Sequence, residues 1–109
     1  MGLFSKKEKL YMYNAKDILL TKIKTFDPTV IDDTQNRFYL KIFLKGRIIE
    51  ISLNCFRKGF ITLDVVDSFG FINIPRKAFK YREDFDEFLR TVVIQKLNWT
   101  KLKSSLLNT

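Results

Sequence analysis

Histidine is absent from the 109-residue chain, and cysteine occurs once. Without an imidazole the protein has neither a histidine general base nor a histidine metal ligand. A single cysteine, Cys55, cannot form an internal disulfide, which excludes a disulfide-stabilised secreted scaffold. No apolar run approaches the roughly 20 residues of a membrane-spanning helix, and the N-terminus lacks the apolar core of a signal peptide. We therefore expect a cytoplasmic protein that is not an integral membrane protein.

Glycine is scarce as well, with four residues in the chain. Gly46, Gly59 and Gly70 are dispersed among expected turns, so they form no glycine-rich loop of the kind that cradles phosphates. The carboxylates that could hold a catalytic metal ion are dispersed too, and their spacing does not predict convergence. They are Asp32, Asp33, Glu50 and Asp64. We therefore predict no enzyme activity, no catalytic residue, no metal site and no cofactor.

Positive charge and aromatic rings are what the chain has in excess. It carries 20 Lys and Arg against 12 Asp and Glu, a net charge of +8, and aromatic residues make up 15% of it. A polyanion is the natural partner of such a protein. A domain this small cannot easily bury so many rings, and rings on the surface tend to mark a contact site.

Residues 38–53 predict a β-hairpin that turns at Lys45 and Gly46. Pairing outward from this turn places six apolar side chains on one face: Phe38, Leu40, Ile42, Ile49, Ile51 and Leu53. The reverse face carries Tyr39 opposite Ser52, Lys41 opposite Glu50 and Phe43 opposite Ile48. A slip of one residue would mix the two sets, so the pattern specifies the register well.

Two further strands are predicted over residues 60–66 and 71–74, the second ending at Pro75 because proline cannot donate to the ladder. Residues 28–36 are polar and predict a loop. Residues 14–26 fit two structures. A helix capped by Asn14 is favoured, while the alternation of Thr21 and Thr25 with lysines fits a strand.

The C-terminal part predicts a long amphipathic helix with Asp84 as its N-cap. Its apolar residues recur at helical spacing: Phe85, Phe88, Leu89, Val92, Val93 and Leu97. This stripe should cover the apolar face of the hairpin. The predicted fold is α+β, a single domain over residues 1–109. It has a four- or five-stranded antiparallel sheet, the long C-terminal helix on one face, and a short N-terminal helix. Residues 1–13 are expected to be flexible or loosely packed.

The outward face of this sheet is the main candidate binding surface. It would carry four rings and five nearby cations: Tyr39, Phe43, Phe60 and Phe71, with Lys41, Lys45, Arg47, Arg57 and Lys58. Arg76 and Lys77 open a basic run after the last strand. Rings among cations suit single-stranded nucleic acid, because each base stacks with about 1–3 kcal/mol and the phosphates pair with Lys and Arg. The alternative is that the N-terminal segment folds over this face.

Four antiparallel strands followed by an amphipathic helix, from Phe38 to Leu97, form an order that resembles the coactivator and Whirly group of single-stranded DNA-binding proteins. The step from residues 70–75 into the helix is part of this likeness. The resemblance implies a curved sheet that holds the nucleic acid and a helix that supports it, often in a dimer.

Our leading interpretation is a small non-enzymatic protein that binds single-stranded DNA or RNA. Proteins of this kind serve replication, transfer or transcription in a phage or mobile element. The alternative is a protein-interaction module, an inhibitor or adaptor whose Phe-rich, basic surface docks on an acidic partner. The C-terminal helix and tail, with Trp99 and Leu106, offer a surface for a homodimer. A third reading places Leu3, Phe4 and the neighbouring lysines on an anionic membrane surface.

Overall fold

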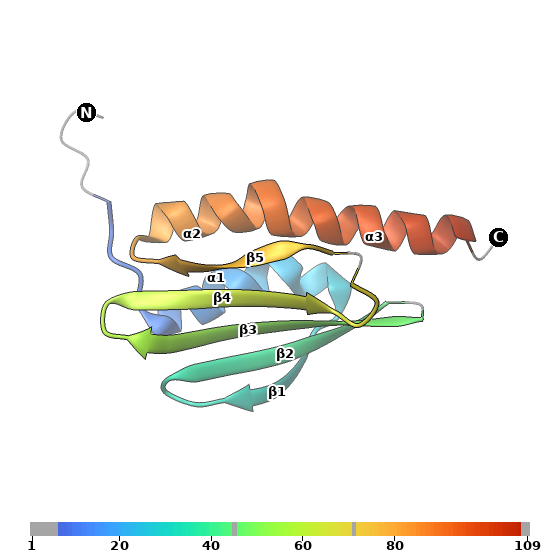
Figure 1. Cartoon of the computed structure of the whole chain (residues 1–109). Coiled ribbons are helices and arrows are strands. Elements are labelled where there is room, and N and C mark those ends of the chain that lie inside the picture. The colour runs from blue at the N-terminus through green and yellow to red at the C-terminus, as the bar shows by residue number, and fades with distance from the viewer. Residues whose placement is uncertain (1–6, 45, 71, 108–109) are drawn as a thin grey trace.

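Five antiparallel strands form one sheet, and the strands follow each other in the sheet as they do in the sequence. The computed structural model describes residues 7–44, 46–70 and 72–107 (Figure 1). The strands are β1 (Thr29–Asp33), β2 (Arg37–Leu44), β3 (Arg47–Arg57), β4 (Phe60–Asp67) and β5 (Ile74–Phe79). Helix α1 (Met12–Ile23) and a short 3-10 turn, η2 (Lys24–Phe26), precede the sheet. A long helix follows it, built from α2 (Arg82–Phe88), a π-helical segment η3 (Leu89–Val93) and α3 (Ile94–Leu107). The predicted α+β fold is confirmed.

The hairpin register is the one that the sequence predicts. Phe38 pairs with Leu53, Leu40 with Ile51 and Ile42 with Ile49. These six side chains are buried, and they form the centre of the hydrophobic core. Because alternate residues of a strand point to opposite faces, Tyr39, Lys41 and Phe43 lie on the other face of the sheet, which we call the outer face.

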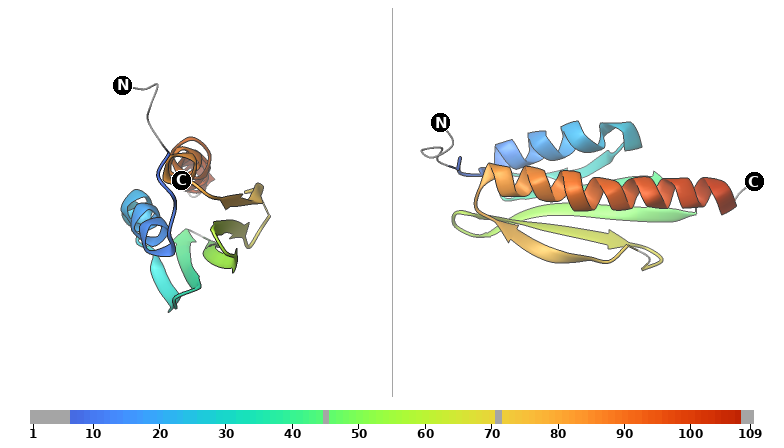
Figure 2. Two further views of the ribbon diagram at one scale, coloured as in Figure 1. Left: turned by 90° about the vertical axis from the view of Figure 1, so that its left-hand side faces the viewer. Right: turned by 90° about the horizontal axis from the view of Figure 1, so that it is seen from above.

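Both helices lie on the same side of the sheet (Figure 2). Residues 14–26 are helical through Ile23, and α1 buries Ala15, Leu19 and Ile23 against the sheet. The C-terminal helix contributes a second buried stripe: Phe85, Leu89, Val93 and Leu97. Among the residues that the structure describes, no element covers the outer face (Figure 2). The N-terminal segment therefore folds into the core layer and does not seal the candidate surface.

The buried residues of the C-terminal helix are spaced four apart, at positions 85, 89, 93 and 97. An α-helix has about 3.6 residues per turn, so side chains spaced in this way drift around the helix. The wider turn of a π-helical segment takes up this drift. The segment η3 over Leu89–Val93 thus keeps the apolar stripe facing the sheet along the length of the helix.

The region expected to be a polar loop, residues 28–36, contains strand β1 instead. Thr29 pairs with Lys41 and Asp33 with Phe38, with a bulge between Val30 and Asp32. The polar side chains misled the prediction because β1 is an edge strand with mostly exposed side chains, and backbone hydrogen bonds to β2 hold it.

The last strand also differs from the prediction of residues 71–74, because β5 begins only at Ile74 and runs through Pro75 to Phe79, while Ile72 and Asn73 precede it outside any strand. Proline is tolerated in an edge strand, where its missing N–H faces away from the ladder. Arg76 and Lys77 therefore lie within β5 rather than after the last strand.

The N-terminal segment was expected to be loosely packed over residues 1–13, but its described part is fixed. The Leu10 amide donates to the Lys80 carbonyl at 2.9 Å, and the Arg82 amide donates to the Glu8 carbonyl at 2.8 Å. Leu10 itself is buried. This pairing also sets the start of α2, whose N-cap is Tyr81 and not Asp84, while the N-cap of α1 is Tyr11 and not Asn14.

Candidate functional site

The outer face presents rings at three levels along the strands. Phe43 stands near the β2–β3 turn and is 59% exposed. Tyr39 lies four residues from Phe43 along β2, a distance of about 13 Å. Tyr39 pairs with Ser52 of β3, and Ser52 pairs with Asp64 of β4. Phe60 lies four residues from Asp64 along β4, toward the β3–β4 turn. Tyr39 and Phe60 are half-buried. The sheet therefore holds a series of ring surfaces that runs from one end to the other.

The cations in the middle of the outer face are paired with carboxylates. Arg37 lies 2.9 Å from Asp32, Lys41 lies 3.9 Å from Glu50, and Arg76 lies 2.9 Å from Asp64. Exposed pairs of this kind contribute little to stability. They do cancel the local charge, so the middle of this face is close to neutral.

Tyr39 is held in place from several sides. Its hydroxyl donates a hydrogen bond to the Glu50 carboxylate, and this bond, together with partial burial and the Glu50 charge, raises the pKa of Tyr39. The Arg37 guanidinium lies 5.1 Å from the centroid of its ring, and the Lys41 ammonium lies 6.0 Å from it. These contacts restrict the position of the ring.

Arg47 is mostly buried and is held by contacts within the protein. Its side chain is 11% exposed, and its guanidinium lies 3.6 Å from the buried Asp67 carboxylate. Asp67 also accepts hydrogen bonds from the amides of Phe69 at 3.0 Å and Ile72 at 3.1 Å. Arg47 and Asp67 together connect the start of β3 to the β4–β5 loop.

Cations without carboxylate partners gather at the opposite end of the sheet, around the β3–β4 turn. We call this surface the cationic end, and it consists of Lys9, Arg57, Lys58, Lys77 and Lys80. None of the five forms an ion pair within the described part of the chain. Phe60 is at its centre, since this ring lines a hollow with Lys9 and Lys58 and a second hollow with Lys77 and Lys80.

Four of these cations lie over aromatic rings. The Arg57 guanidinium is 4.7 Å from the centroid of Phe60, and the Lys77 ammonium is 5.0 Å from that of Phe88. Lys9 lies 5.4 Å from the ring of Tyr11, and Lys80 lies 5.6 Å from that of Tyr81. A bulge in β3 between Asn54 and Arg57 turns this part of the strand, and Gly59 makes the tight turn with φ of 86°.

The hollow between β5 and α2 has a volume of about 460 Å³. Phe60, Phe79 and Phe88 supply its apolar wall. Lys77 and Lys80 line it together with the carboxylates of Asp84 and Glu87, so its charges are mixed.

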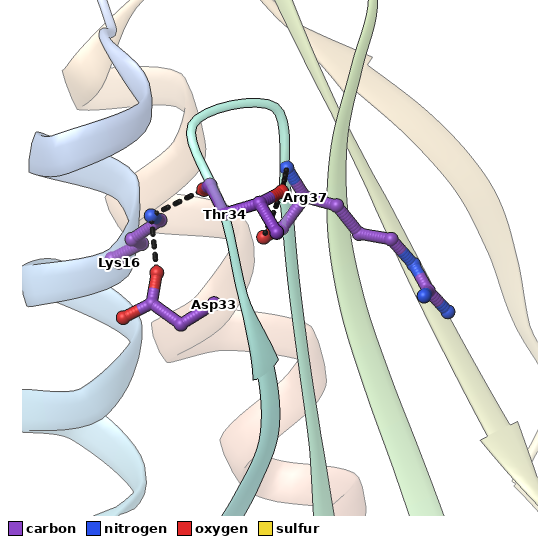
Figure 3. Close-up of polar contacts among 4 residues, drawn as sticks. All are labelled: Lys16, Asp33, Thr34 and Arg37. Atoms are coloured by element: carbon purple, nitrogen blue, oxygen red, sulfur yellow. Dashed lines mark hydrogen bonds and ion pairs between the residues drawn. The ribbon is translucent and has the colours of Figure 1, made fainter.

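The β1–β2 turn closes the same end of the molecule and is fixed by α1 (Figure 3). The Lys16 ammonium forms an ion pair with Asp33 and donates to the Thr34 carbonyl at 2.8 Å. The Thr34 hydroxyl accepts a hydrogen bond from the Arg37 amide at 3.1 Å. The Arg37 side chain points away from Lys16, across the strands (Figure 3).

The predicted site residues thus fall into three groups. Arg57, Lys58, Phe60 and Lys77 come together at the cationic end, Tyr39, Lys41 and Arg76 lie in the charge-paired middle, and Phe43 and Arg47 lie at the far end. Lys45 and Phe71 lie outside the described residues.

Sequence reasoning missed Lys9 and Tyr11, because residues 1–13 were taken as a flexible or loosely packed segment. The sequence did contain one signal that this segment is packed. Apolar Leu10 lies between the polar residues Lys9 and Tyr11, and such alternation is typical of an extended segment that pairs with a strand. Lys80 and Tyr81 belong to the basic run that begins at Arg76 in the sequence.

Among the residues that the structure describes, no three Cys, Asp or Glu side chains gather as a metal site would require. None of the helices in those residues is long and apolar enough to cross a bilayer. Comparison with protein-family models, curated proteins and solved structures gives no match.

Proposed function

We propose that the protein binds single-stranded nucleic acid without catalysing a reaction. In this proposal the cationic end contacts the phosphates, and Phe60 and the rings of the outer face stack on bases. The observation that carries it is the arrangement around Phe60, a half-buried ring at the end of the sheet. It lies among five cations that form no ion pair within the described residues, although Asp84 and Glu87 share one hollow with Lys77 and Lys80.

Stacking and charge act together in this arrangement. A base that stacks on an aromatic side chain gains about 1–3 kcal/mol, and every base has a face that can do so. Arg57 lies over Phe60 at 4.7 Å, so the phosphate next to a stacked base would lie within reach of its guanidinium. Single strands are favoured over duplexes because the faces of paired bases are already covered by their neighbours.

Binding of labelled single-stranded DNA, duplex DNA and RNA across a salt series tests this function. If the five cations each neutralise one phosphate, the affinity for a single strand should fall about a hundredfold between roughly 50 and 200 mM salt. Duplex DNA should bind more weakly than the single strand. Absence of single-strand binding at low salt, or equal binding of the duplex, would contradict the proposal.

A protein-interaction module is the second candidate, and the far end of the outer face favours it. The middle of that face is charge-paired, and Phe43, Val66 and Phe69 are exposed. Exposed aromatic and apolar side chains serve protein interfaces as well, and an acidic partner would also contact the cationic end. Phe43→Ala distinguishes the two, because it should lower the affinity for single strands if the rings of the outer face stack on bases, and leave it unchanged if this end of the face binds a protein.

We also propose that the protein acts in the cytoplasm, where its unpaired Cys55 would stay reduced. A homodimer would use the C-terminal helix, where Trp99 and Leu102 are exposed and α3 extends beyond the sheet (Figure 1). Analytical ultracentrifugation of the wild type and of Trp99→Ala tests the dimer. The wild type should sediment with the mass of two chains and the variant with the mass of one.

A further inference from the structure

A second hollow of about 460 Å³ opens at the cationic end, on the side of α1. Three segments that are distant in the sequence enclose it, namely residues 9–13 before and at the start of α1, the β1–β2 turn at residues 35–36, and the β3–β4 turn at residues 58–61. Cavities of small-molecule sites span roughly 300–1,000 Å³, so this one is large enough for a single small ligand.

The charge of the lining selects the kind of ligand. Lys9, Lys16 and Lys58 line the hollow, and no Asp or Glu does so among the described residues. Lys16 is already engaged by Asp33 and by the Thr34 carbonyl (Figure 3). Lys9 and Lys58 are thus the cations available to an anionic group at the rim.

The walls offer flat aromatic surfaces. Tyr11 and Tyr13 are stacked, with ring centroids 5.8 Å apart and an angle of 12° between the planes. Phe60 faces the same hollow, and Leu10 and Ile61 contribute apolar surface. A planar, aromatic ligand fits such walls better than an aliphatic one, because its faces can stack on the rings.

Two side-chain amides complete the lining. Gln35 and Asn36 are exposed in the β1–β2 turn, and neither side-chain amide makes a hydrogen bond within the described residues. The turn itself is held, since the Asn36 carbonyl accepts the Cys55 amide at 3.0 Å and Lys16 fixes Thr34. A carboxamide offers a donor next to an acceptor, the pattern that matches the edge of a nucleobase.

We propose that this cavity receives one nucleobase of a bound strand, with its phosphate on Lys9 and Lys58 and its edge read by Gln35 and Asn36. The inference rests on the proposed function and adds to it a site of base preference. The stacking surfaces of the outer face tolerate any base, whereas a cavity with amides discriminates among them.

Cys55 lines the cavity and is the only cysteine of the chain, so its alkylation by iodoacetamide reports on the occupant in the unmodified protein. Homopolymeric DNA strands of each base, and an abasic strand of equal length, are added while fluorescence anisotropy confirms that each strand is bound. At a strand concentration about ten times the Kd, the strand with the preferred base should slow alkylation about tenfold. The abasic strand should not slow it.

Asn36→Ala provides the complementary measurement. The variant should reduce the difference in affinity between the preferred and the poorest homopolymer about tenfold or more. Its matched control is Asn73→Ala, an exposed asparagine at the far end of the sheet that should leave the preference unchanged.

The outcomes separate this inference from the function on which it rests. Two results would contradict the binding of a base in the cavity while leaving single-strand binding intact. One is strands that bind without protecting Cys55 from alkylation, and the other is an abasic strand that protects Cys55 as well as the strands with bases do. Protection by nucleoside monophosphates alone, at the concentrations at which strands protect, would assign the cavity to free nucleotides instead. If no strand binds at all, both proposals fail together.

Discussion

The guanidinium of Arg57 lies 4.7 Å from the centroid of the Phe60 ring, across the β3–β4 turn. Lys58 lies between the two in sequence and is exposed. We expect the double variant Arg57→Gln with Lys58→Gln to bind single strands with a shallower salt dependence. Two lost phosphate contacts reduce the slope of log affinity against log salt by about 1.4. A salt series followed by fluorescence anisotropy measures it.

The control for this variant is Lys24→Gln with Arg90→Gln, which removes the same charge from exposed positions outside the cationic end. Its slope should stay close to that of the wild type. If both double variants lose the same slope, the protein attracts nucleic acid through net charge alone and the cationic end has no special role.

Phe60 itself should contribute by stacking. Phe60→Leu keeps an apolar side chain but removes the aromatic face, and should lower the affinity for single strands about tenfold, which corresponds to about 1.4 kcal/mol of lost stacking. Phe60→Tyr retains the ring and should bind almost as the wild type does. Equal affinities of the leucine and tyrosine variants would argue against base stacking at this position.

The buried carboxylate of Asp67 should be essential for stability. Asp67→Ala leaves Arg47 without this partner and removes the acceptor of the Phe69 and Ile72 amides, which should lower the free energy of unfolding by about 3 kcal/mol or more. Asp64→Ala breaks an exposed pair with Arg76 and should cost less than about 1 kcal/mol. Urea denaturation compares the two, and similar losses would mean that the Asp67 network is not formed.

Tyr39 should titrate above the ordinary tyrosine value of about 10. Its hydrogen bond to Glu50 favours the protonated phenol and raises the pKa of Tyr39. Because the pKa is higher in the folded than in the unfolded chain, the contribution to stability is complete below the unfolded pKa and is lost as pH rises through the folded one. The phenolate absorbance of wild type minus Tyr39→Phe isolates this residue, and Glu50→Gln should move its midpoint back down. A midpoint that Glu50→Gln leaves in place would exclude the hydrogen bond as the cause.

Adjacent residues of β4 should respond in opposite ways to the same substitution. Val65 is 4% exposed and Val66 is 48% exposed, on opposite faces of the strand. Val65→Lys buries an unpaired ammonium and should prevent folding, whereas Val66→Lys should change stability by no more than about 0.5 kcal/mol. Circular dichroism and urea denaturation of both variants test which face is open.

The central hairpin and the C-terminal helix follow from the sequence because their apolar residues recur with a clear period, whereas the pattern of residues 14–26 fitted a strand almost as well as the helix that forms there. A shift of one residue in the hairpin would have placed Leu40 and Ile51 in water, so the pattern left a single register. Strand β1 has no such pattern. Its polar side chains are exposed at the edge of the sheet, and its backbone bonds, which composition does not report, keep it there.

The candidate site was predictable in its residue types but only in part in its distribution of charge. The pair of Lys41 with Glu50 follows from the predicted hairpin register and is confirmed. Arg76 looked like an available cation, yet Asp64 of the neighbouring strand β4 approaches it, a relation that depends on a pairing of β4 with β5 that the sequence did not predict. Lys9 and Tyr11 join the site because residues 8–10 pair with residues 80–82, far away in the chain. Such long-range contacts leave almost no trace in local sequence.

The most direct test of the central claim is a map of backbone amide shifts in two-dimensional NMR spectra as a single-stranded oligonucleotide is added at low salt. The account predicts that the largest shifts fall around residues 57–60, on residues 77–80 and along the outer face of β2 and β4. Shifts confined to the C-terminal helix, or spread evenly over the surface, would contradict it.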